Sequence, residues 1–231
     1  MAEIAEQTGI SRASVHRLLN TLVREGYVLV DGKPRRYYPS LRVWEMSAAT
    51  LDRYAARETV LPYAIELALS SGQAIALSLY ERGDVVFSDR IQVSGDRVMP
   101  ALLNLRAPAL TTAAGRALLA QQPHDEIERV IQRGVPQNTP YTKTEPEVLR
   151  EELRLTRQRG YGLVEKEVSL EMCGVGFAVL DRDGRPAVGL GVLVYGAFPN
   201  DFFGRVVPMA SMFAQRASME LGYRPAVPAI T

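Results

Sequence analysis

The first regular pattern of apolar and polar positions along the chain begins at Ser11. From there to Arg24, apolar residues recur at positions i, i+3, i+4, i+7 and i+8, which is the spacing of one buried helix face. The residues of this face are Val15, Leu18, Leu19, Leu22 and Val23. Ser11 is a favourable helix N-cap, and Gly26 is a C-terminal signal. The spacing therefore predicts an amphipathic helix that starts at Arg12 and ends just before Gly26.

The pattern then changes to that of a β-hairpin. Residues 27–30 (YVLV) predict a strand, Asp31-Gly32 a tight turn and residues 35–38 (RRYY) the returning strand. Residues 1–8 predict a short helix before the turn at residues 9–10. Two helices followed by a basic hairpin are the plan of a winged helix-turn-helix. In that fold the second helix enters the major groove of DNA and the hairpin lies along the DNA backbone.

The side of the predicted helix opposite its apolar face carries residue types that contact phosphates and base edges. Together with the hairpin, ten residues are expected to contact DNA: Ser11, Arg12, Ser14, His16, Arg17, Asn20, Lys33, Arg35, Arg36 and Tyr37. From Gly9 to Arg42, seven Lys/Arg residues oppose two acidic residues, so this stretch carries +5 while the whole chain carries +1. Basic charge concentrated in one stretch is typical of phosphate binding. The alternative is a solvent-exposed helix and hairpin without a DNA-binding role.

A helix-turn-helix needs a further helix to close its small core. Here the sequence begins with the helix directly before the turn. We therefore expect the first helix of the module to be missing. Either the start codon is set too far downstream, or the module is incomplete.

Beyond residue 40 the pattern predicts a linker helix and then a domain in which helices flank an antiparallel sheet, which is the α+β class. We expect helices at residues 41–54, 57–71, 111–120, 123–132, 145–159 and 201–221, extended segments at residues 73–80, 85–91, 98–105, 161–168, 175–180 and 187–195, and a loop at residues 106–110. The predicted domains are a winged helix-turn-helix (1–40), a linker helix (41–56), a sensor-like α+β domain (57–224) and a flexible tail (225–231).

Composition excludes several classes of protein. Of the 231 residues, 47% are hydrophobic, which suffices for a small module and one larger core. No apolar run approaches the roughly 20 residues of a membrane span, and no secretory signal is present, so we expect a cytoplasmic protein without a membrane partner. The single cysteine excludes an internal disulfide framework. With two histidines far apart in sequence, we expect no metal site, and we expect no cofactor.

Four segments in this order resemble the IclR family of bacterial transcription regulators. They are AEIAEQTGISRASVHRLLNTLVREGYV (2–28), LRAPALTTAAGRALLA (105–120), EPEVLREELRLTRQRGYGL (145–163) and CGVGFAVLDRDGRPAVGLGVLV (173–194). Each segment is weak evidence alone, and the order of the four makes the resemblance specific. It implies a winged-helix DNA-binding domain, a linker helix and a GAF-like α/β effector domain that binds a small organic acid. It also implies homodimers that often pair into tetramers.

The resemblance further implies where the effector binds. The implied residues are Leu105, Thr111, Thr112, Ala113, Gly115, Val164, Cys173, Gly191, Leu193 and Tyr195. The chain departs from the family pattern at several positions, with Asn104 for a glycine, Leu110 for a histidine and Val164 for an acidic residue. An apolar and aromatic lining favours an effector that is bulkier or more aromatic than a two- or three-carbon keto acid. We expect its carboxylate at the helix N-terminal N–H groups of residues 111–113.

Several of these residues also have a simpler structural interpretation. Cys173 either lines the pocket or fills the core as a small buried hydrophobe. Thr111 and Thr112 either donate to a carboxylate or only cap a helix. Tyr195 either stacks on a ligand or faces the core. Arg106 is either a carboxylate partner or a solvated loop charge.

The sequence therefore predicts a DNA-binding transcriptional regulator whose C-terminal domain senses a small carboxylic acid and controls catabolic genes. The rival interpretation is an effector-binding protein or an enzyme with a non-functional, truncated DNA-binding module. Against an enzyme, no nucleophile–base pair is evident, because His16 is far in sequence from Cys173. We therefore predict no catalytic residues.

Overall fold

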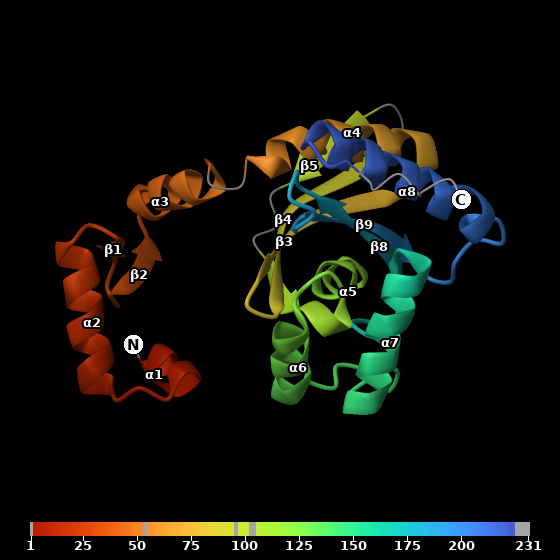
Figure 1. Cartoon of the computed structure of the whole chain (residues 1–231). Coiled ribbons are helices and arrows are strands. Elements are labelled where there is room, and N and C mark those ends of the chain that lie inside the picture. The colour runs from red at the N-terminus through yellow and green to blue at the C-terminus, as the bar shows by residue number, and fades with distance from the viewer. Residues whose placement is uncertain (1, 53–54, 95–96, 102–104, 225–231) are drawn as a thin grey trace. The chain divides into compact units, whose positions relative to one another are not determined.

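The computed structural model describes residues 2–52, 55–94, 97–101 and 105–224 (Figure 1). The predicted flexible tail (225–231) and the departure at Asn104 lie outside the described residues. The chain divides into two compact units, Met1–Ala55 and Ala56–Thr231, and the predicted linker helix groups with the first. Each unit is therefore described by itself.

The first unit has the elements of a winged helix-turn-helix. Its helices are α1 (Ala2–Thr8), α2 (Arg12–Arg24) and α3 (Leu41–Asp52), and its hairpin pairs β1 (Val28–Asp31) with β2 (Arg36–Pro39). Ser11 caps α2 as predicted, because its side chain accepts a hydrogen bond from the backbone N–H of Ser14 at 3.3 Å. The hairpin register pairs Asp31 with Arg36, which places the turn at Gly32–Arg35.

The apolar face of α2 is less buried than its spacing predicts. Val15 is 2% exposed and Leu19 is 8% exposed, whereas Leu18 and Leu22 are 53% and 40% exposed. Within the described residues, α2 packs against α1 and β1. These two short elements cover only the side of α2 that carries Val15 and Leu19. The prediction that Leu18 and Leu22 are buried was therefore wrong for this chain.

The start of α3 is fixed to the end of α2. Arg42 donates from Nη1 to the carbonyl of Glu25 at 2.6 Å, and its guanidinium lies over the ring of Tyr27, 5.1 Å from the ring centroid. Ser40 donates from Oγ to the carbonyl of Gly26 at 2.5 Å. These contacts satisfy carbonyl groups that a helix end leaves without partners. Arg42 therefore has a structural role, although it also adds to the positive charge of this unit.

The second unit is an α+β domain. Its helices are α4 (Ala56–Ser71), α5 (Ala113–Leu119), α6 (His124–Arg133), α7 (Pro146–Arg159) and α8 (Phe202–Glu220), with a 3-10 turn η1 (Ala109–Thr111) before α5. Its strands are β3 (Ala74–Glu81), β4 (Asp84–Ser94), β5 (Arg97–Ala101), β6 (Leu105–Pro108), β7 (Gly162–Glu165), β8 (Met172–Leu180) and β9 (Pro186–Tyr195). None of the helices in the described part of the chain is long and apolar enough to cross a membrane.

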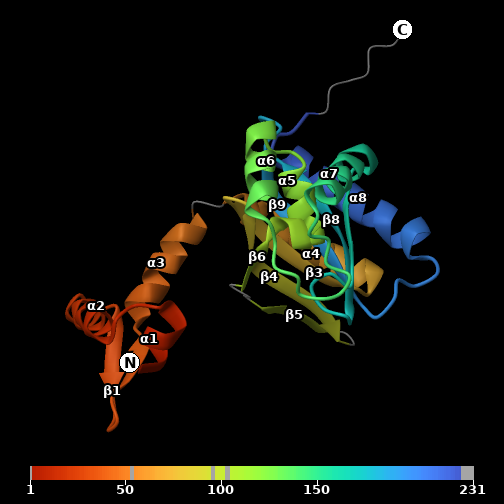
Figure 2. The same ribbon diagram turned by 90° about the horizontal axis from the view of Figure 1, so that it is seen from below.

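The seven strands form one antiparallel sheet in the order β5-β4-β3-β9-β8-β7, with β6 paired to β4. Helices α4 and α8 cover one face of this sheet and α5 covers the other (Figure 1). Helices α6 and α7 lie on the same side as α5 (Figure 2). Between them, Leu118, Val130 and Leu149 are each at most 1% exposed and form one apolar cluster. The sheet therefore has a packed helix layer on each face.

Two predicted segments differ from the structure. Residues 106–110 were expected to form a loop, but Leu105–Pro108 form β6 and pair with Asp84–Phe87 of β4. This pairing is not local in sequence, so neither propensity nor periodicity signals it. The strand predicted over residues 161–168 ends at Glu165, and residues 166–171 form turns before β8.

Candidate functional site

The ten predicted DNA-contacting residues lie on α2 and the hairpin. We call them the α2–wing surface. Eight of the ten are exposed, and Ser14 and Tyr37 are half-buried. On the helix, His16 lies one turn before Asn20, whose Nδ2 is 3.3 Å from the imidazole Nδ1. Both side chains thus stand on the solvent side of α2, where polar groups suit base edges in a major groove.

The cations of this surface are free to meet phosphate. Among the described residues, no carboxylate lies within ion-pair distance of Arg12, Arg17, Lys33, Arg35 or Arg36. Arg24, at the end of α2, is instead paired with Glu25 at 3.0 Å. Unpaired and exposed cations keep their full attraction for a polyanion.

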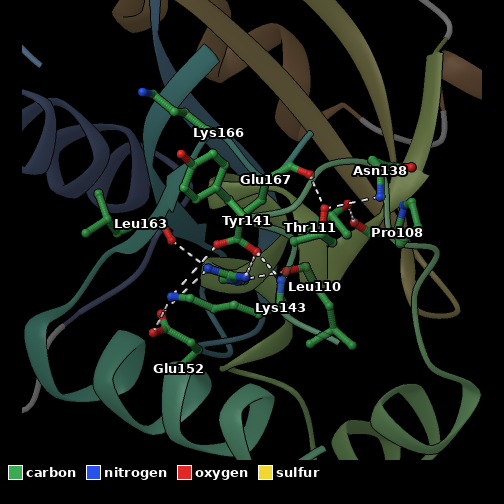
Figure 3. A network of polar contacts seen from close by, with 12 residues as sticks. Pro108, Leu110, Thr111, Asn138, Tyr141, Lys143, Glu152, Leu163, Lys166 and Glu167 are labelled. Carbon is green, nitrogen blue, oxygen red and sulfur yellow. Dashed lines mark hydrogen bonds and ion pairs between the residues drawn. The ribbon is translucent and has the colours of Figure 1, made fainter. Parts of the chain in front are cut away.

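A buried polar network fixes the start of α5 in the second unit (Figure 3). Arg116 is fully buried, and its guanidinium donates to the carbonyls of Leu110 and Leu163, each at 2.7 Å, and to the carboxylate of Glu167 at 2.6 Å. Glu152 of α7 lies 3.6 Å from Nη1 of the same arginine. The guanidinium therefore connects η1 and β7 through hydrogen bonds and α7 through an ion pair.

The loop that precedes α7 completes this network. Lys143 Nζ is 2.6 Å from Glu152, and the backbone N–H of Lys143 donates to the carboxylate of Glu167 at 3.3 Å. Thr142 donates from Oγ1 to the carbonyl of Glu167 at 2.7 Å. The contacts named here are all within the second unit, so this network has a structural role.

A cavity of about 300 Å³ opens at one end of the sheet, where β3 begins and β4 and β9 end. Its lining residues are Gly72, Gln73, Ala74, Gln92, Val93, Leu193, Val194, Tyr195, Ala197 and Pro199. Two of the predicted effector residues, Leu193 and Tyr195, are among them. The volume lies at the lower end of the range for small-molecule sites.

Arg90 borders this cavity through two of its lining residues. Its Nη2 donates to Tyr195 Oη at 2.6 Å and to Gln92 Oε1 at 3.1 Å, and the guanidinium lies 5.8 Å from the centroid of the Tyr195 ring. Arg90 is not among the residues that the sequence predicts for the effector site. The available signal was the alternation along the strand, because an inward-facing Asp89 implies that Arg90 faces the other side.

The remaining predicted effector residues separate into groups. Gly191, Val164 and Leu193 lie on the face of the sheet that α5 covers. Gly191 and Gly174 approach α5, and Val164 and Leu193 each pair with Gly174. Leu105, on β6, is 59% exposed.

The threonines at the start of α5 act as structural residues. Thr112 is the N-cap and accepts a hydrogen bond from the N–H of Gly115 at 3.1 Å. Thr111 donates to the carbonyl of Pro108 at 2.9 Å, and Ala113 follows Thr112 as the first residue of α5. Because both hydroxyls are used within the chain, the structure supports the capping interpretation. None of these residues lines the cavity described above.

Cys173 lies on the opposite face of the sheet from the cavity residues Leu193 and Tyr195. A Cβ at Gly174 would lie 3.9 Å from the Cβ of Ala113 and 4.0 Å from Cδ2 of Leu193, so position 174 faces α5. Successive side chains of a strand point to opposite faces, so Cys173 points away from Leu193 and Tyr195. The thiol is 5% exposed, and burial raises its pKa. Cys173 therefore fills the core on the opposite face and is removed from the effector set.

Comparison with known proteins follows the same division of the chain. The family described as the IclR helix-turn-helix domain matches residues 1–32, and the family described as the bacterial transcriptional regulator IclR C-terminal matches residues 48–199. The chain is similar to the HTH-type transcriptional regulator KdgR of Escherichia coli K12, with 26% identity over 230 residues that cover 96% of this chain and 86% of the relative.

Solved structures show the same fold. An IclR transcriptional regulator from Alicyclobacillus acidocaldarius superposes with a TM-score of 0.78 at 23% identity, covering 96% of this chain and 90% of that chain. An IclR homolog from Microbacterium hydrocarbonoxydans, crystallised with 4-hydroxybenzoate, gives a TM-score of 0.73 at 19% identity, covering 95% and 90%. The matched C-terminal segment alone spans more than half of the 231 residues. The chain therefore belongs to the IclR family of bacterial transcriptional regulators, which are DNA-binding proteins with an effector domain and not enzymes.

Proposed function

We propose that the α2–wing surface binds operator DNA and that the cavity at the end of the sheet binds a small carboxylic acid that controls this binding. The genes under control would be those that break down the acid, and the protein would act in the cytoplasm. The observation that carries the DNA part is the set of exposed, unpaired cations on α2 and the hairpin. An α2 placed in the major groove would bring Arg12 and Arg17 to the DNA, and the hairpin would bring Arg35 and Arg36 to the backbone.

The DNA proposal is tested by mobility shift with the intergenic DNA beside the gene. Replacing both Arg12 and Arg17 with alanine should weaken specific binding by roughly 1–3 kcal/mol for each arginine that reads a base. The matched control is the double alanine variant of Arg182 and Arg185, which are exposed arginines of the β8–β9 turn. Equal affinity of the α2 variant and the control would reject α2 as the recognition helix.

Replacing Arg35 and Arg36 has a different expected effect. Phosphate contacts carry no sequence information, so their loss should weaken all DNA sequences alike. The slope of log K against log salt should fall by roughly two, because each lost phosphate contact removes about 0.9 from it. An unchanged slope would show that the wing does not contact the backbone.

The lining of the cavity supports an aromatic or extended acid as the effector. Leu193 and Tyr195 present apolar surface, and each buried methylene adds about 0.8 kcal/mol in a dry site. The 4-hydroxybenzoate complex of the Microbacterium hydrocarbonoxydans homolog is consistent with an aromatic acid in this fold. Calorimetry with a panel of carboxylates tests the proposal. Tighter binding of pyruvate or glyoxylate than of any phenyl-substituted acid would reject it, as would an unaltered ligand ranking in a Tyr195→Ser variant.

We also propose a homodimer as the DNA-binding state, with pairing of dimers into tetramers. Dimers of helix-turn-helix proteins read two half-sites one helical turn apart, and one 231-residue chain carries one recognition helix. Light scattering on the protein with and without operator DNA tests this. A monomer bound to a single half-site would contradict it.

A further inference from the structure

We infer that Arg90 is the residue that holds the carboxylate of the effector. Tyr195 and Gln92, which line the cavity, hold its guanidinium beside it. This inference rests on the proposed function, because it names the charged partner of the acid proposed there. It also replaces the position that the sequence suggested, the N–H groups at the start of α5, because residues 111–113 do not line this cavity.

The strand β4 places Arg90 on the α5 face of the sheet. The preceding residue, Asp89, accepts hydrogen bonds from Arg57 of α4 at 2.7 and 2.5 Å, so Asp89 faces the α4 side. Alternation then turns Arg90 and Gln92 to the opposite side, where Tyr195 of β9 meets them. Three side chains from two strands thus converge at the cavity that Gln92 and Tyr195 line.

Arg90 differs from those arginines of the second unit that form ion pairs. Arg57 is paired with Asp89, Arg106 with Glu81 and Asp84, and Arg116 with Glu167. Within the described residues, Arg90 forms no ion pair, and its hydrogen-bond partners are the neutral groups of Gln92 and Tyr195. Its guanidinium therefore carries a positive charge that no carboxylate of the described residues pairs with.

One N–H donor of this guanidinium also lacks an acceptor. The Nε atom is buried and has no hydrogen-bond partner among the described residues, and a buried donor without a partner is costly. Guanidinium groups present a planar fork of N–H donors that matches a carboxylate. A carboxylate at the guanidinium would neutralise the cation. The apolar part of the acid would then lie on Leu193, inside the cavity.

A purely structural role for Arg90, bridging β4 and β9, makes a different prediction. Such a bridge would affect stability but not the preference of the site for a charged over a neutral ligand. The test therefore compares each acid with its amide, which has the same shape and no charge. Calorimetry would use benzoate and benzamide, phenylacetate and phenylacetamide, and acetate and acetamide with the full-length protein.

For the wild type, we expect the best acid to bind roughly 10- to 100-fold more tightly than its amide, as for a hydrogen-bonded charge. Arg90→Met should lose most of this preference while the amide binds as before. Arg90→Lys should keep part of it, because lysine keeps the charge but not the fork. The matched control is Arg185→Met, an exposed arginine at the opposite end of β9, which should keep the wild-type ratio.

Tyr195→Phe provides a second variant that removes only the hydroxyl that orients Nη2. It should weaken binding of the acid more than binding of the amide, although the effect should be smaller than that of Arg90→Met. If an acid binds the wild type and Arg90→Met keeps the same acid-to-amide ratio, the role of Arg90 is overturned and the proposed function stands. If no acid of the panel binds the wild type, the proposed effector class and the role of Arg90 both fail.

Discussion

At the scale of single residues, Arg116 decides how α5 is held. A fully buried guanidinium is tolerated only when its donors are satisfied, and here two carbonyls and the carboxylate of Glu167 satisfy them. The carboxylate of Glu167 is as deeply buried, with its side chain 2% exposed. Removal of either partner would leave an unpaired charge inside the domain, which is far more costly than the loss of a surface pair.

We therefore expect Glu167→Ala to lower the free energy of unfolding of the second unit by roughly 3–5 kcal/mol. Glu147→Ala is the matched control, because Glu147 is 86% exposed and pairs with Arg150 across one helical turn at 2.6 Å. That change should cost less than about 0.5 kcal/mol. Urea unfolding followed by circular dichroism measures both variants. Similar losses in the two variants would show that the Arg116 network does not stabilise the fold.

Cys173 gives a prediction about reactivity. Burial raises the pKa of its thiol, and the thiolate is the reactive form. We expect Ellman's reagent at pH 8 to label the folded protein more slowly than the urea-unfolded protein, because the buried thiol forms less thiolate and is shielded from the reagent. The labelling rate should rise with pH, since more thiolate forms. Fast labelling of the folded protein would place Cys173 in an accessible site rather than in the core.

At the scale of elements, the contact between α5 and the sheet depends on the absence of side chains. Gly176 of β8 lies so close to α5 that a Cβ there would be 2.2 Å from the backbone nitrogen of Ala114. A Cβ at Gly162 of β7 would be 2.1 Å from the carbonyl oxygen of Ala113. The backbone of α5 therefore touches the backbones of β7 and β8 with no side chain between them. Such a close approach is a common reason for glycine inside strands. This close approach leaves no room for a ligand between α5 and these two strands.

Gly176→Ala should therefore destabilise the second unit by about 3 kcal/mol, because the added methyl group forces α5 away from β8. Gly204→Ala is the opposite case. Gly204 lies in α8, and nothing lies within 4 Å of a Cβ added there. That change should stabilise the second unit by about 0.5–1 kcal/mol, because alanine is a better helix former than glycine. Thermal unfolding of both variants measures the difference. A neutral Gly176→Ala would disprove the tight contact.

Elements with a local signal could be predicted from the sequence. The end of α7 is marked by Gly160, which adopts φ 81° and ends the helix. The β1–β2 hairpin was also predicted, although its turn spans Gly32–Arg35 and Asp31, expected in the turn, ends β1. In contrast, β6 contains Pro108 and exists through pairing with β4, so it was predicted as a loop. The exposure of Leu18 was also missed, because a helical spacing shows which face is apolar and not what covers it.

At the scale of the whole molecule, the two proposed sites were predictable to different degrees. The α2–wing surface is continuous in sequence, so its residues were found by helix spacing and turn chemistry alone. The cavity brings together the start of β3 and the ends of β4 and β9, and Tyr195 of β9 lies 105 residues beyond Arg90 of β4. Leu193 and Tyr195 entered the effector set only through the family resemblance. Strand alternation could indicate the face on which Arg90 lies, but its significance depends on a partner on β9 and on having no ion-pair partner among the described residues.

The division into two units gives a last prediction, about how ligands act on stability. Each unit has buried residues of its own, such as Val15 in the first and Leu118 in the second, so we expect two unfolding transitions rather than one. A carboxylic acid that binds in the second unit stabilises only that unit. At a concentration of 100 Kd the gain is about 2.7 kcal/mol, which corresponds to roughly 5–10 °C for a unit of this size.

Differential scanning calorimetry of the full chain, without DNA, measures this effect. Val15→Ala should lower only the transition of the first unit and Glu167→Ala only that of the second, so the two variants assign the transitions. The acid should then raise the transition that Glu167→Ala lowers and leave the other in place. Operator DNA should do the reverse, because the proposed DNA contacts all lie on α2 and the hairpin. If the acid instead raised the transition assigned by Val15→Ala, the effector would bind outside the second unit, and the cavity beside Arg90 would not be its site.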